Sequence, residues 1–295
     1  MPALGDYVTF HDPALARRYV RRRMPIAKLC EAYFEGKLDF HRPIAEFLQA
    51  RADHVSYELT WEHLKWATTR YLPAAVARSR GREAANVQAQ YDRGDDFFRW
   101  FLGDSMAYTC GFFDDPSMTL EQAQERSIDR VLEKLALQPG ERLLDVGCGW
   151  GTLVARAAEH WGADVTGVTI SRNQADFADA QLAERGLSKR ARILCQDYRD
   201  VAGRGFDKVV CLEMVEHVGV RNLGTFYRKM SELLSNRGLF LLQWTGLRSH
   251  PRPEELMFGL FMEMHVAPGA DAGLCQSAMM QRIEHAGFHT KSVEN

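Results

Sequence analysis

Apolar and polar residues follow two patterns along the chain, and the pattern changes near residue 120. Beyond that point, short apolar runs alternate with longer amphipathic segments. The runs predict strands at 142–146, 164–169, 191–195, 206–213 and 238–245. The amphipathic segments predict helices at 120–137, 151–160, 173–185 and 223–234, the first of them capped by Thr119 and Gln122. Strands separated by such helices are typical of βαβ units, so the sequence predicts an α/β fold with a doubly wound, mostly parallel sheet.

The first 85 residues form a separate region. Their pattern is that of helices, interrupted by prolines at positions 25, 43 and 73, each of which ends or kinks a helix. The region holds 14 Lys and Arg against 10 Asp and Glu, whereas the rest of the chain carries a negative excess. The sequence therefore predicts a helical N-terminal extension over residues 1–85 and a larger domain over residues 86–295.

Two segments of this extension suggest contact with a lipid surface. One is the basic run from Arg17 to Arg23, and the other is Trp61-Glu-His-Leu-Lys-Trp66. A solvated helix face accounts for both segments. The alternative is an amphipathic surface that meets anionic lipid headgroups, where each arginine contributes about 1 kcal/mol.

Composition and charge narrow the classes of function. The chain is 46% hydrophobic and 26% charged, which is ordinary for a globular protein. Its net charge of -2 argues against a nucleic-acid partner. No apolar run reaches the roughly 20 residues of a membrane span, and the N-terminus lacks a secretory signal. The six cysteines are scattered, so we expect neither disulfides nor a metal site, but a cytoplasmic protein whose membrane contact is peripheral.

A glycine loop follows the first predicted strand of the sheet. It reads Leu143-Leu-Asp-Val-Gly-Cys-Gly-Trp-Gly151, with glycines at 147, 149 and 151. Glycines at such a turn let the backbone approach a ligand and direct helix N–H groups at it. The G-x-G-x-G spacing differs from the G-x-G-x-x-G fingerprint of dinucleotide sites. Asp145, just before the loop, suits the ammonium of an amino-acid moiety, so Asp145, Gly147, Gly149 and Gly151 favour S-adenosylmethionine as cofactor.

The ends of the next two strands extend this candidate cofactor site. Thr169 and Gln174 stand where a ribose would lie, and Asp197 and Tyr198 can offer a carboxylate and a ring to an adenine. Each has a structural alternative, since Thr169 and Gln174 could cap a helix and Tyr198 could belong to the core. Because all of them lie in register at one edge of the sheet, we favour cofactor binding.

Several motifs over residues 86–295 resemble the cyclopropane-fatty-acid synthase superfamily of S-adenosylmethionine-dependent methyltransferases. They are Tyr91-Asp-Arg-Gly-Asp-Asp-Phe97, Ala107-Tyr-Thr-Cys-Gly111, Leu144-Asp-Val-Gly-Cys-Gly-Trp-Gly151, Gln196-Asp-Tyr-Arg199 and Glu216-His-Val-Gly219. Within this superfamily, the segments 211–221 and 243–248 look most like the sphingolipid C-methyltransferase branch. Plant amine N-methyltransferases such as coclaurine N-methyltransferase are more distant and share an E-x-x-E-H pattern, carried here by Glu213, Glu216 and His217.

The resemblance implies methyl transfer to a carbon of a lipid double bond, in a Rossmann-like class I methyltransferase fold. It places Tyr108 and Thr109 beside the cofactor. Cyclopropane synthases hold a bicarbonate base with a Cys, a Glu and a His, helped by a C-terminal Tyr. Cys110 and Glu216 match the first two, while Gln243 stands at the His position, as in the sphingolipid branch, which weakens the case for ring closure.

The same residues have structural alternatives. Cys110 could be a small buried side chain, Glu216 a helix cap, and His217 a donor to the backbone. The aromatic residues at 97, 98, 100, 101, 112 and 113 could line an acyl tunnel or form core.

Three functions follow from these observations. The first is a lipid carbon methyltransferase acting on a lipid substrate at a membrane surface. The second is an amine N-methyltransferase, in which Glu213, Glu216 and His217 bind or deprotonate the amine. The third is a non-catalytic remnant, because the family continues past residue 295 with a Tyr-bearing helix and a closing strand pair. We expect that strand pair to be missing and the chain to be poorly soluble. The oligomeric state stays open, a homodimer included.

Overall fold

The computed structural model describes residues 3–73, 80–271 and 273–294. The chain divides into two compact units, Met1–Arg78 with His250–Val266, and Ser79–Ser249 with Ala267–Asn295. The first unit thus contains most of the expected extension together with a segment from the C-terminal half of the chain. In the described ranges, no helix combines the length and the apolar character that a bilayer crossing requires.

The first unit contains the expected helices and also short strands that the sequence analysis missed. Strand β1 (Val8–Phe10) pairs with β3 (Leu38–Phe40) antiparallel, and β2 (Met24–Pro25) pairs with β4 (Val55–Ser56) parallel. The helices are α1 (Pro13–Tyr19), α2 (Ile26–Phe34), α3 (Ile44–His54), α4 (Trp61–Trp66) and α13 (Pro253–Phe261). Segments of two or three residues are too short to show the two-residue period of a strand, so the pattern did not reveal them. Phe261 joins α13 to this unit by packing on Phe34.

The basic run of the first unit is not one helix face. Arg17 and Arg18 lie in α1, which ends at the buried Tyr19, and the next three arginines lie in the turn before β2. Two of the prolines also differ from the expectation, since Pro25 and Pro43 are the N-cap residues of α2 and α3 and precede helices instead of breaking them. Pro73 is the last residue described before the gap.

The second unit contains the predicted α/β sheet. Its strands are β5 (Arg142–Val146), β6 (Asp164–Thr169), β7 (Ala191–Cys195), β8 (Phe206–Leu212) and β9 (Leu234–Gln243), all parallel in the order β7-β6-β5-β8-β9. The fold class is confirmed. The fifth strand begins four residues before the predicted position, because the chain passes from the preceding helix directly into the sheet at Leu234.

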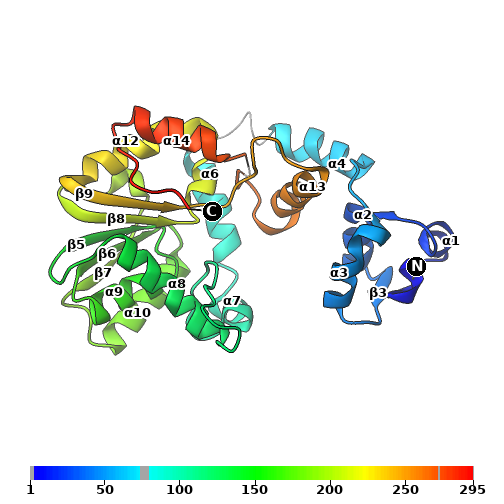
Figure 1. Cartoon of the computed structure of the whole chain (residues 1–295), viewed down its shortest axis with the longest axis horizontal. Helices are drawn as coiled ribbons and strands as arrows, with labels where there is room; N and C mark the ends of the chain where they lie inside the picture. Colours follow the sequence, from blue (N-terminus) through cyan, green and yellow to red (C-terminus); the bar gives the residue numbers. More distant parts are fainter. Residues whose placement is uncertain (1–2, 74–79, 272, 295) are drawn as a thin grey trace. The chain divides into compact units, whose positions relative to one another are not determined.

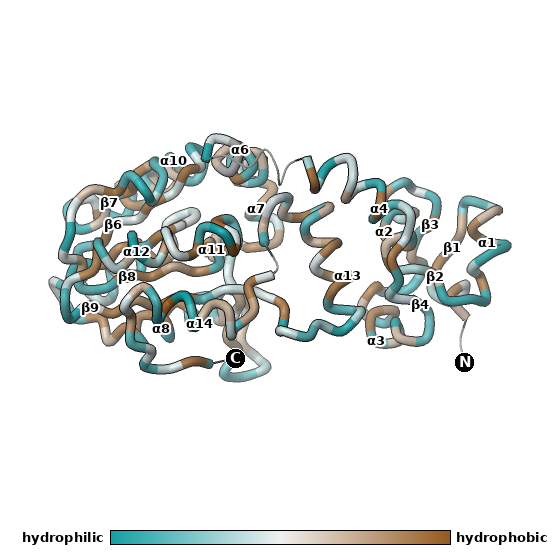
Figure 2. Tube along the Cα trace, turned by 90° about the horizontal axis from the view of Figure 1, so that it is seen from above, coloured by the Kyte–Doolittle hydropathy of each residue, from teal (hydrophilic) through white to brown (hydrophobic). Residues whose placement is uncertain are grey.

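Helices cover both faces of this sheet (Figure 1). The helices of this unit are α6 (Arg80–Tyr91), α7 (Asp95–Leu102), α8 (Leu120–Lys134), α9 (Thr152–His160), α10 (Arg172–Glu184), α11 (Val215–Val218), α12 (Leu223–Leu233) and α14 (Gln276–His285). One apolar core joins the sheet to α8, α9 and α10, and a second joins it to α12 and α14. In Figure 2 the hydrophobic run of β8 contrasts with the hydrophilic positions along α8, whose cap at Thr119 and Gln122 is present as predicted.

The central strand β5 marks the point where the sheet's strand order reverses. It pairs with β6 on one side and β8 on the other, so Leu144 lies opposite both Thr166 and Val209. The connections on either side of such a strand diverge and leave a crevice at the carboxyl ends of the strands, where ligands of doubly wound sheets bind. The glycine loop, which follows β5 directly, occupies this position.

Candidate functional site

The glycine loop needs its three glycines for two different reasons. Gly147, Gly149 and Gly151 all have positive φ, of 86°, 53° and 80°, a region that side chains other than glycine disfavour. A Cβ on Gly147 would lie 2.6 Å from Cγ of Met214, and one on Gly151 would lie 2.7 Å from Cβ of Ala178. A Cβ on Gly149 would meet no atom within 4 Å. Packing therefore requires the outer glycines, whereas the middle one faces open space that a ligand can enter.

Asp145 lies beneath this loop as a buried carboxyl group. It is 3% exposed, and burial raises its pKa to about 7. A cation brought next to such a group favours the charged form and lowers the pKa again. Asp145 is thus suited to bind the ammonium of an amino-acid moiety, directly or through the intervening backbone.

Because the pKa of Asp145 is raised in the folded protein, the free energy of unfolding should depend on pH. The folded pKa lies above the unfolded value of 3.8, so the folded protein keeps a proton between about pH 4 and 7 that the unfolded chain has lost. This group's contribution to stability therefore falls as the pH rises through that window. At pH 8 we expect Asp145→Asn to be more stable than the wild type by on the order of 4 kcal/mol and to bind S-adenosylmethionine more weakly. Urea unfolding at pH 5 and pH 8 measures this, and an unchanged pH dependence would contradict it.

The end of β6 holds a buried polar pair. The Thr169 hydroxyl donates to Oε1 of Gln174 at 2.7 Å, and both side chains are buried. The structural alternative for this pair was a helix cap, but the cap of α10 is Ser171, whose hydroxyl accepts from the backbone N–H of Gln174. The Thr169 hydroxyl also accepts from the backbone N–H of this N-cap residue at 3.2 Å, so the pair supports the start of α10 without being its cap.

Two aspartates that the sequence analysis did not single out attach α6 and α7 to this edge of the sheet. Asp92 accepts a hydrogen bond from the Ser171 hydroxyl at 2.5 Å. Oδ1 of Asp95 accepts from the indole N–H of Trp150, in the glycine loop, and from the Asn173 amide, both at 2.7 Å. Both aspartates belong to the Tyr91–Phe97 motif, so that motif was the available signal, although nothing in the sequence identified their partners.

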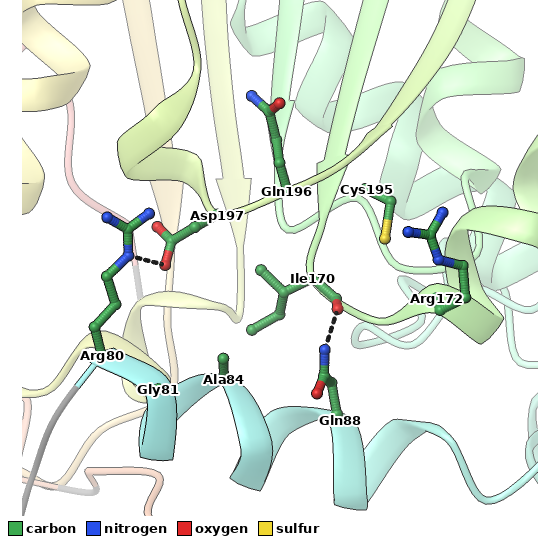
Figure 3. Close-up of a pocket in the computed structure, with 9 residues that line it drawn as sticks. All are labelled: Arg80, Gly81, Ala84, Gln88, Ile170, Arg172, Cys195, Gln196 and Asp197. Carbon is green, nitrogen blue, oxygen red and sulfur yellow. Dashed lines mark hydrogen bonds and ion pairs between the residues drawn. The ribbon is translucent and has the colours of Figure 1, made fainter.

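A pocket of about 470 Å³ opens between α6 and the ends of β6 and β7. Figure 3 shows Arg80 and Gln88 of α6 directed toward the sheet edge, where Arg80 meets Asp197 and Gln88 donates to the Ile170 carbonyl at 3.0 Å. The pocket lies beside the predicted adenine-binding residues. Arg80 is a residue that the sequence analysis missed, since it was assigned to the N-terminal extension.

Asp197 and Tyr198 both have partners at this pocket. Burial acts to raise the Asp197 pKa, but hydrogen bonds from Arg199 outweigh it and hold the pKa below its ordinary value. Arg199 donates to both carboxylate oxygens, at 2.9 Å and 2.7 Å, and Arg80 donates at 3.2 Å. The Tyr198 ring packs edge-on against Phe226, as the core alternative predicts, and stays partly exposed. An adenine amino group would therefore share the Asp197 carboxylate with two arginines.

A second group of polar side chains lies at the ends of β8 and β9. Oε1 of Glu213 accepts from the Gln243 amide at 2.9 Å, from the Thr109 hydroxyl at 3.3 Å and from the Cys110 thiol at 3.6 Å. The Gln243 amide also donates to Thr109 at 2.8 Å. The structure thus brings together four of the predicted site residues, and the carboxylate beside Cys110 is that of Glu213. Cys110 is exposed and not the small buried side chain of the structural alternative, and partial desolvation, reinforced by this carboxylate, raises the pKa of its thiol.

Glu216 lies one helical turn further along, with different partners. It is 9% exposed; its Oε1 accepts from the Thr245 N–H at 2.6 Å, and its Oε2 has no hydrogen-bond partner among the described residues. Burial raises the Glu216 pKa to about 7, and the charge of Glu213 adds to this rise. Glu216 is therefore a desolvated carboxyl group with one oxygen that has no partner among the described residues and is open to water, an ion or a ligand.

His217 and Tyr108 border the two carboxyl groups. The Tyr91 hydroxyl lies 3.4 Å from Nε2 of His217, and the Tyr91 ring packs edge-on against Tyr108. Burial raises the pKa of both tyrosines, so both hydroxyls stay protonated near neutral pH. Of the aromatic residues predicted as tunnel or core, Phe98 belongs to the core, while the other five are exposed.

Comparisons with known proteins identify the relatives of this chain. Residues 78–295 match the family model described as mycolic acid cyclopropane synthetase. The chain is 40% identical over 301 residues to a sphingolipid C9-methyltransferase of Komagataella phaffii, which covers 98% of the chain and 62% of the relative. It is 41% identical over 290 residues to sphingolipid C9-methyltransferase A of Emericella nidulans, covering 96% of the chain and 56% of the relative. The chain thus spans about three fifths of the length of these relatives.

Two solved structures of cyclopropane synthases are similar to this chain. The cyclopropane synthase MmaA2 from Mycobacterium tuberculosis aligns with a TM-score of 0.65 and 33% identity, over 70% of this chain and 75% of that one. The mycolic acid cyclopropane synthase CmaA1, complexed with SAH and CTAB, aligns with a TM-score of 0.66 and 34% identity, over 72% of this chain and 76% of that one.

Proposed function

Because the chain belongs to the mycolic acid cyclopropane synthetase family, we propose that it transfers a methyl group from S-adenosylmethionine to a carbon of a double bond in a lipid chain. The observation that carries the proposal is the contact between the two halves of the site. Met214, which follows Glu213, lies directly against Gly147 of the glycine loop. A cofactor seated on the loop would therefore present its reactive end to the carboxyl groups at the ends of β8 and β9.

The residues of the glycine loop fit this cofactor. The open space at Gly149 admits a ligand close to the backbone. The pKa of the buried Asp145 is raised by burial with no opposing cation among the described residues, and an ammonium would supply that positive charge. When bound, S-adenosylmethionine supplies an electrophilic methyl group. An alkene is a weak nucleophile, so the chain must hold it in line with that methyl group and keep water away.

The carboxyl groups of the site stabilise the positive charge that develops on the lipid. Glu216 is desolvated, and an electrostatic interaction in a water-poor site is stronger than in water. The rings of Tyr91 and Tyr108 add faces that favour a cation. We propose a sphingoid chain as the acceptor, on the strength of the relatives named sphingolipid C9-methyltransferases.

The acceptor can be tested with S-adenosylmethionine labelled in the methyl group. The purified chain is incubated with an unsaturated sphingolipid in vesicles and, separately, with a soluble benzylisoquinoline amine. The proposal expects label in the organic extract of the first reaction. Label in the amine instead would favour N-methylation by the acidic cluster, and label in neither would overturn the proposed function.

We propose further that the first unit brings the enzyme to the lipid surface. Arg21, Arg22 and Arg23 are exposed in the turn that precedes β2. On α4, Trp61 is 71% exposed and Leu64 is 52% exposed. Exposed arginines together with exposed apolar side chains are the features by which peripheral proteins bind anionic membranes.

Replacing the arginines at 21, 22 and 23 by glutamine should weaken binding to anionic vesicles by about 10²-fold, at about 1 kcal/mol for each charge. Vesicle sedimentation at low salt measures the loss. Added salt should weaken the wild type in the same direction, because it screens exposed charges. The matched control replaces the same residues by lysine, which keeps the charge and should retain most of the binding. Equal sedimentation of the glutamine variant and the wild type with vesicles would contradict the proposal that these arginines bind the membrane.

A further inference from the structure

The carboxylate of Glu213 is held in a way that suits proton transfer. Three donors, from Thr109, Cys110 and Gln243, converge on its Oε1. Among the described residues, no hydrogen bond ends on Oε2 of the same group, and the side chain is only partly buried. One oxygen therefore fixes the group in place, while the other is left to accept a proton.

The backbone holds this carboxylate in an unusual position. Glu213 follows β8 directly and has a φ of +52°, in the left-handed region that residues other than glycine seldom adopt. Its N–H donates to the Gln243 carbonyl at 2.9 Å, which fixes the turn against β9. Residues in this region persist only where the surrounding structure imposes it, and such residues cluster at functional sites.

We propose that Glu213 is the base that completes the reaction, a role that rests on the proposed methyl transfer. As the methyl–sulfur bond breaks and a carbon–carbon bond forms, the adjacent lipid carbon becomes cationic. Oε2 of Glu213 then takes a proton from the neighbouring carbon, and the electron pair of that C–H bond restores a double bond. The products are a methyl-branched alkene, a neutral thioether and a protonated Glu213, which returns its proton to water.

The bicarbonate base implied by the resemblance to cyclopropane synthases does not fit this arrangement. Of the residues expected to hold it, Cys110 and Gln243 both donate to Oε1 of Glu213. The remaining one, Glu216, is a second carboxyl group, whose Oε1 accepts from the Thr245 N–H and whose Oε2 has no partner among the described residues. A carboxylate thus occupies the position between the thiol and the amide, and a second anion placed there would be repelled by Glu213. The chain's own carboxylate takes the place of an external base.

Two variants test this inference. Glu213→Gln keeps the size of the side chain and removes its basicity, so kcat should fall by about 10²-fold or more, with little change in the Kd of S-adenosylmethionine. Glu213→Gly suits the positive φ and empties the space between Cys110 and Gln243. Its lost activity should return in a saturable manner on addition of bicarbonate or formate, whereas the Gln variant, whose side chain still fills the space, should not respond.

A binding measurement adds a readout that is independent of activity. Formate and bicarbonate should raise the melting temperature of Glu213→Gly and leave that of the wild type unchanged. Wild-type lipid methylation that needs added bicarbonate, or a Glu213→Gly variant of near-normal rate without any anion, would overturn the assignment of the base alone. A wild type that methylates no lipid would overturn the proposed function and this inference with it.

Discussion

Replacing Gly149 by valine should abolish measurable binding of S-adenosylmethionine while the fold remains intact. A Cβ at this position meets no protein atom within 4 Å, so the side chain does not disturb the packing of the unit. It would instead occupy the space through which a ligand approaches the loop, and the φ of +53° disfavours valine locally. Isothermal titration calorimetry measures the affinity, and circular dichroism checks the fold.

Gly186 provides a matched control for this substitution. Its φ is +69°, and a Cβ there also meets nothing within 4 Å, but it follows α10 and lies outside the candidate site. Gly186→Val should therefore show the same modest loss of stability and normal cofactor affinity. If Gly149→Val binds the cofactor as tightly as this control, the glycine loop is not the cofactor site.

The second large effect concerns Glu216. Glu216→Gln keeps the shape of the side chain and removes the charge that we assign to stabilising the lipid cation, so turnover should fall by about 10²-fold or more. The raised pKa adds a pH signature. The folded pKa of about 7 exceeds the ordinary value of 4.5, so the carboxyl group is neutral below pH 7 and the wild-type rate should rise as the pH increases through 7.

A pH series of kcat for the wild type and Glu216→Gln tests this assignment. The variant should lose the rise near pH 7 and bind S-adenosylmethionine normally. Glu232→Gln on the exposed face of α12 is the matched control and should leave turnover unchanged. A Glu216 variant with a wild-type rate would leave this residue with only its structural bond to the Thr245 N–H.

The sheet was predictable from the sequence because its central strands β5, β6 and β8 are mostly buried and its edge strands contain short runs of mainly apolar residues. The runs at 142–146, 164–169 and 191–195 match β5, β6 and β7 to the residue, since an apolar run bounded by turn residues specifies a buried strand. The strands of the first unit have two or three residues each and carry no such signal. The return of His250–Val266 to that unit depends on contacts such as Phe34 with Phe261, which lie far apart in sequence.

The candidate site was predictable in its residue types but not in its pairings. Position at the end of a parallel strand indicated Asp145, Thr169 and Glu216, because the strand ends converge at one edge of the sheet. Glu213, and not Glu216, lies beside Cys110 because its backbone has a positive φ. Composition and motif spacing do not reveal a single backbone angle. The ion pairs of Asp197 with Arg80 and Arg199 were not predicted either, because pairing depends on the folded structure and Arg80 comes from α6, far away in the sequence.

The most direct test of the account is mass spectrometry of an unsaturated sphingolipid after reaction with S-adenosylmethionine that carries a fully deuterated methyl group. Methyl transfer followed by removal of a chain proton predicts a branched lipid that retains its double bond and every deuterium of the transferred group. A cyclopropane would contain one deuterium fewer, because its ring closes by loss from the methyl carbon. That product would contradict removal of the proton from the lipid chain by Glu213. An unlabelled lipid would contradict methyl transfer to the lipid altogether.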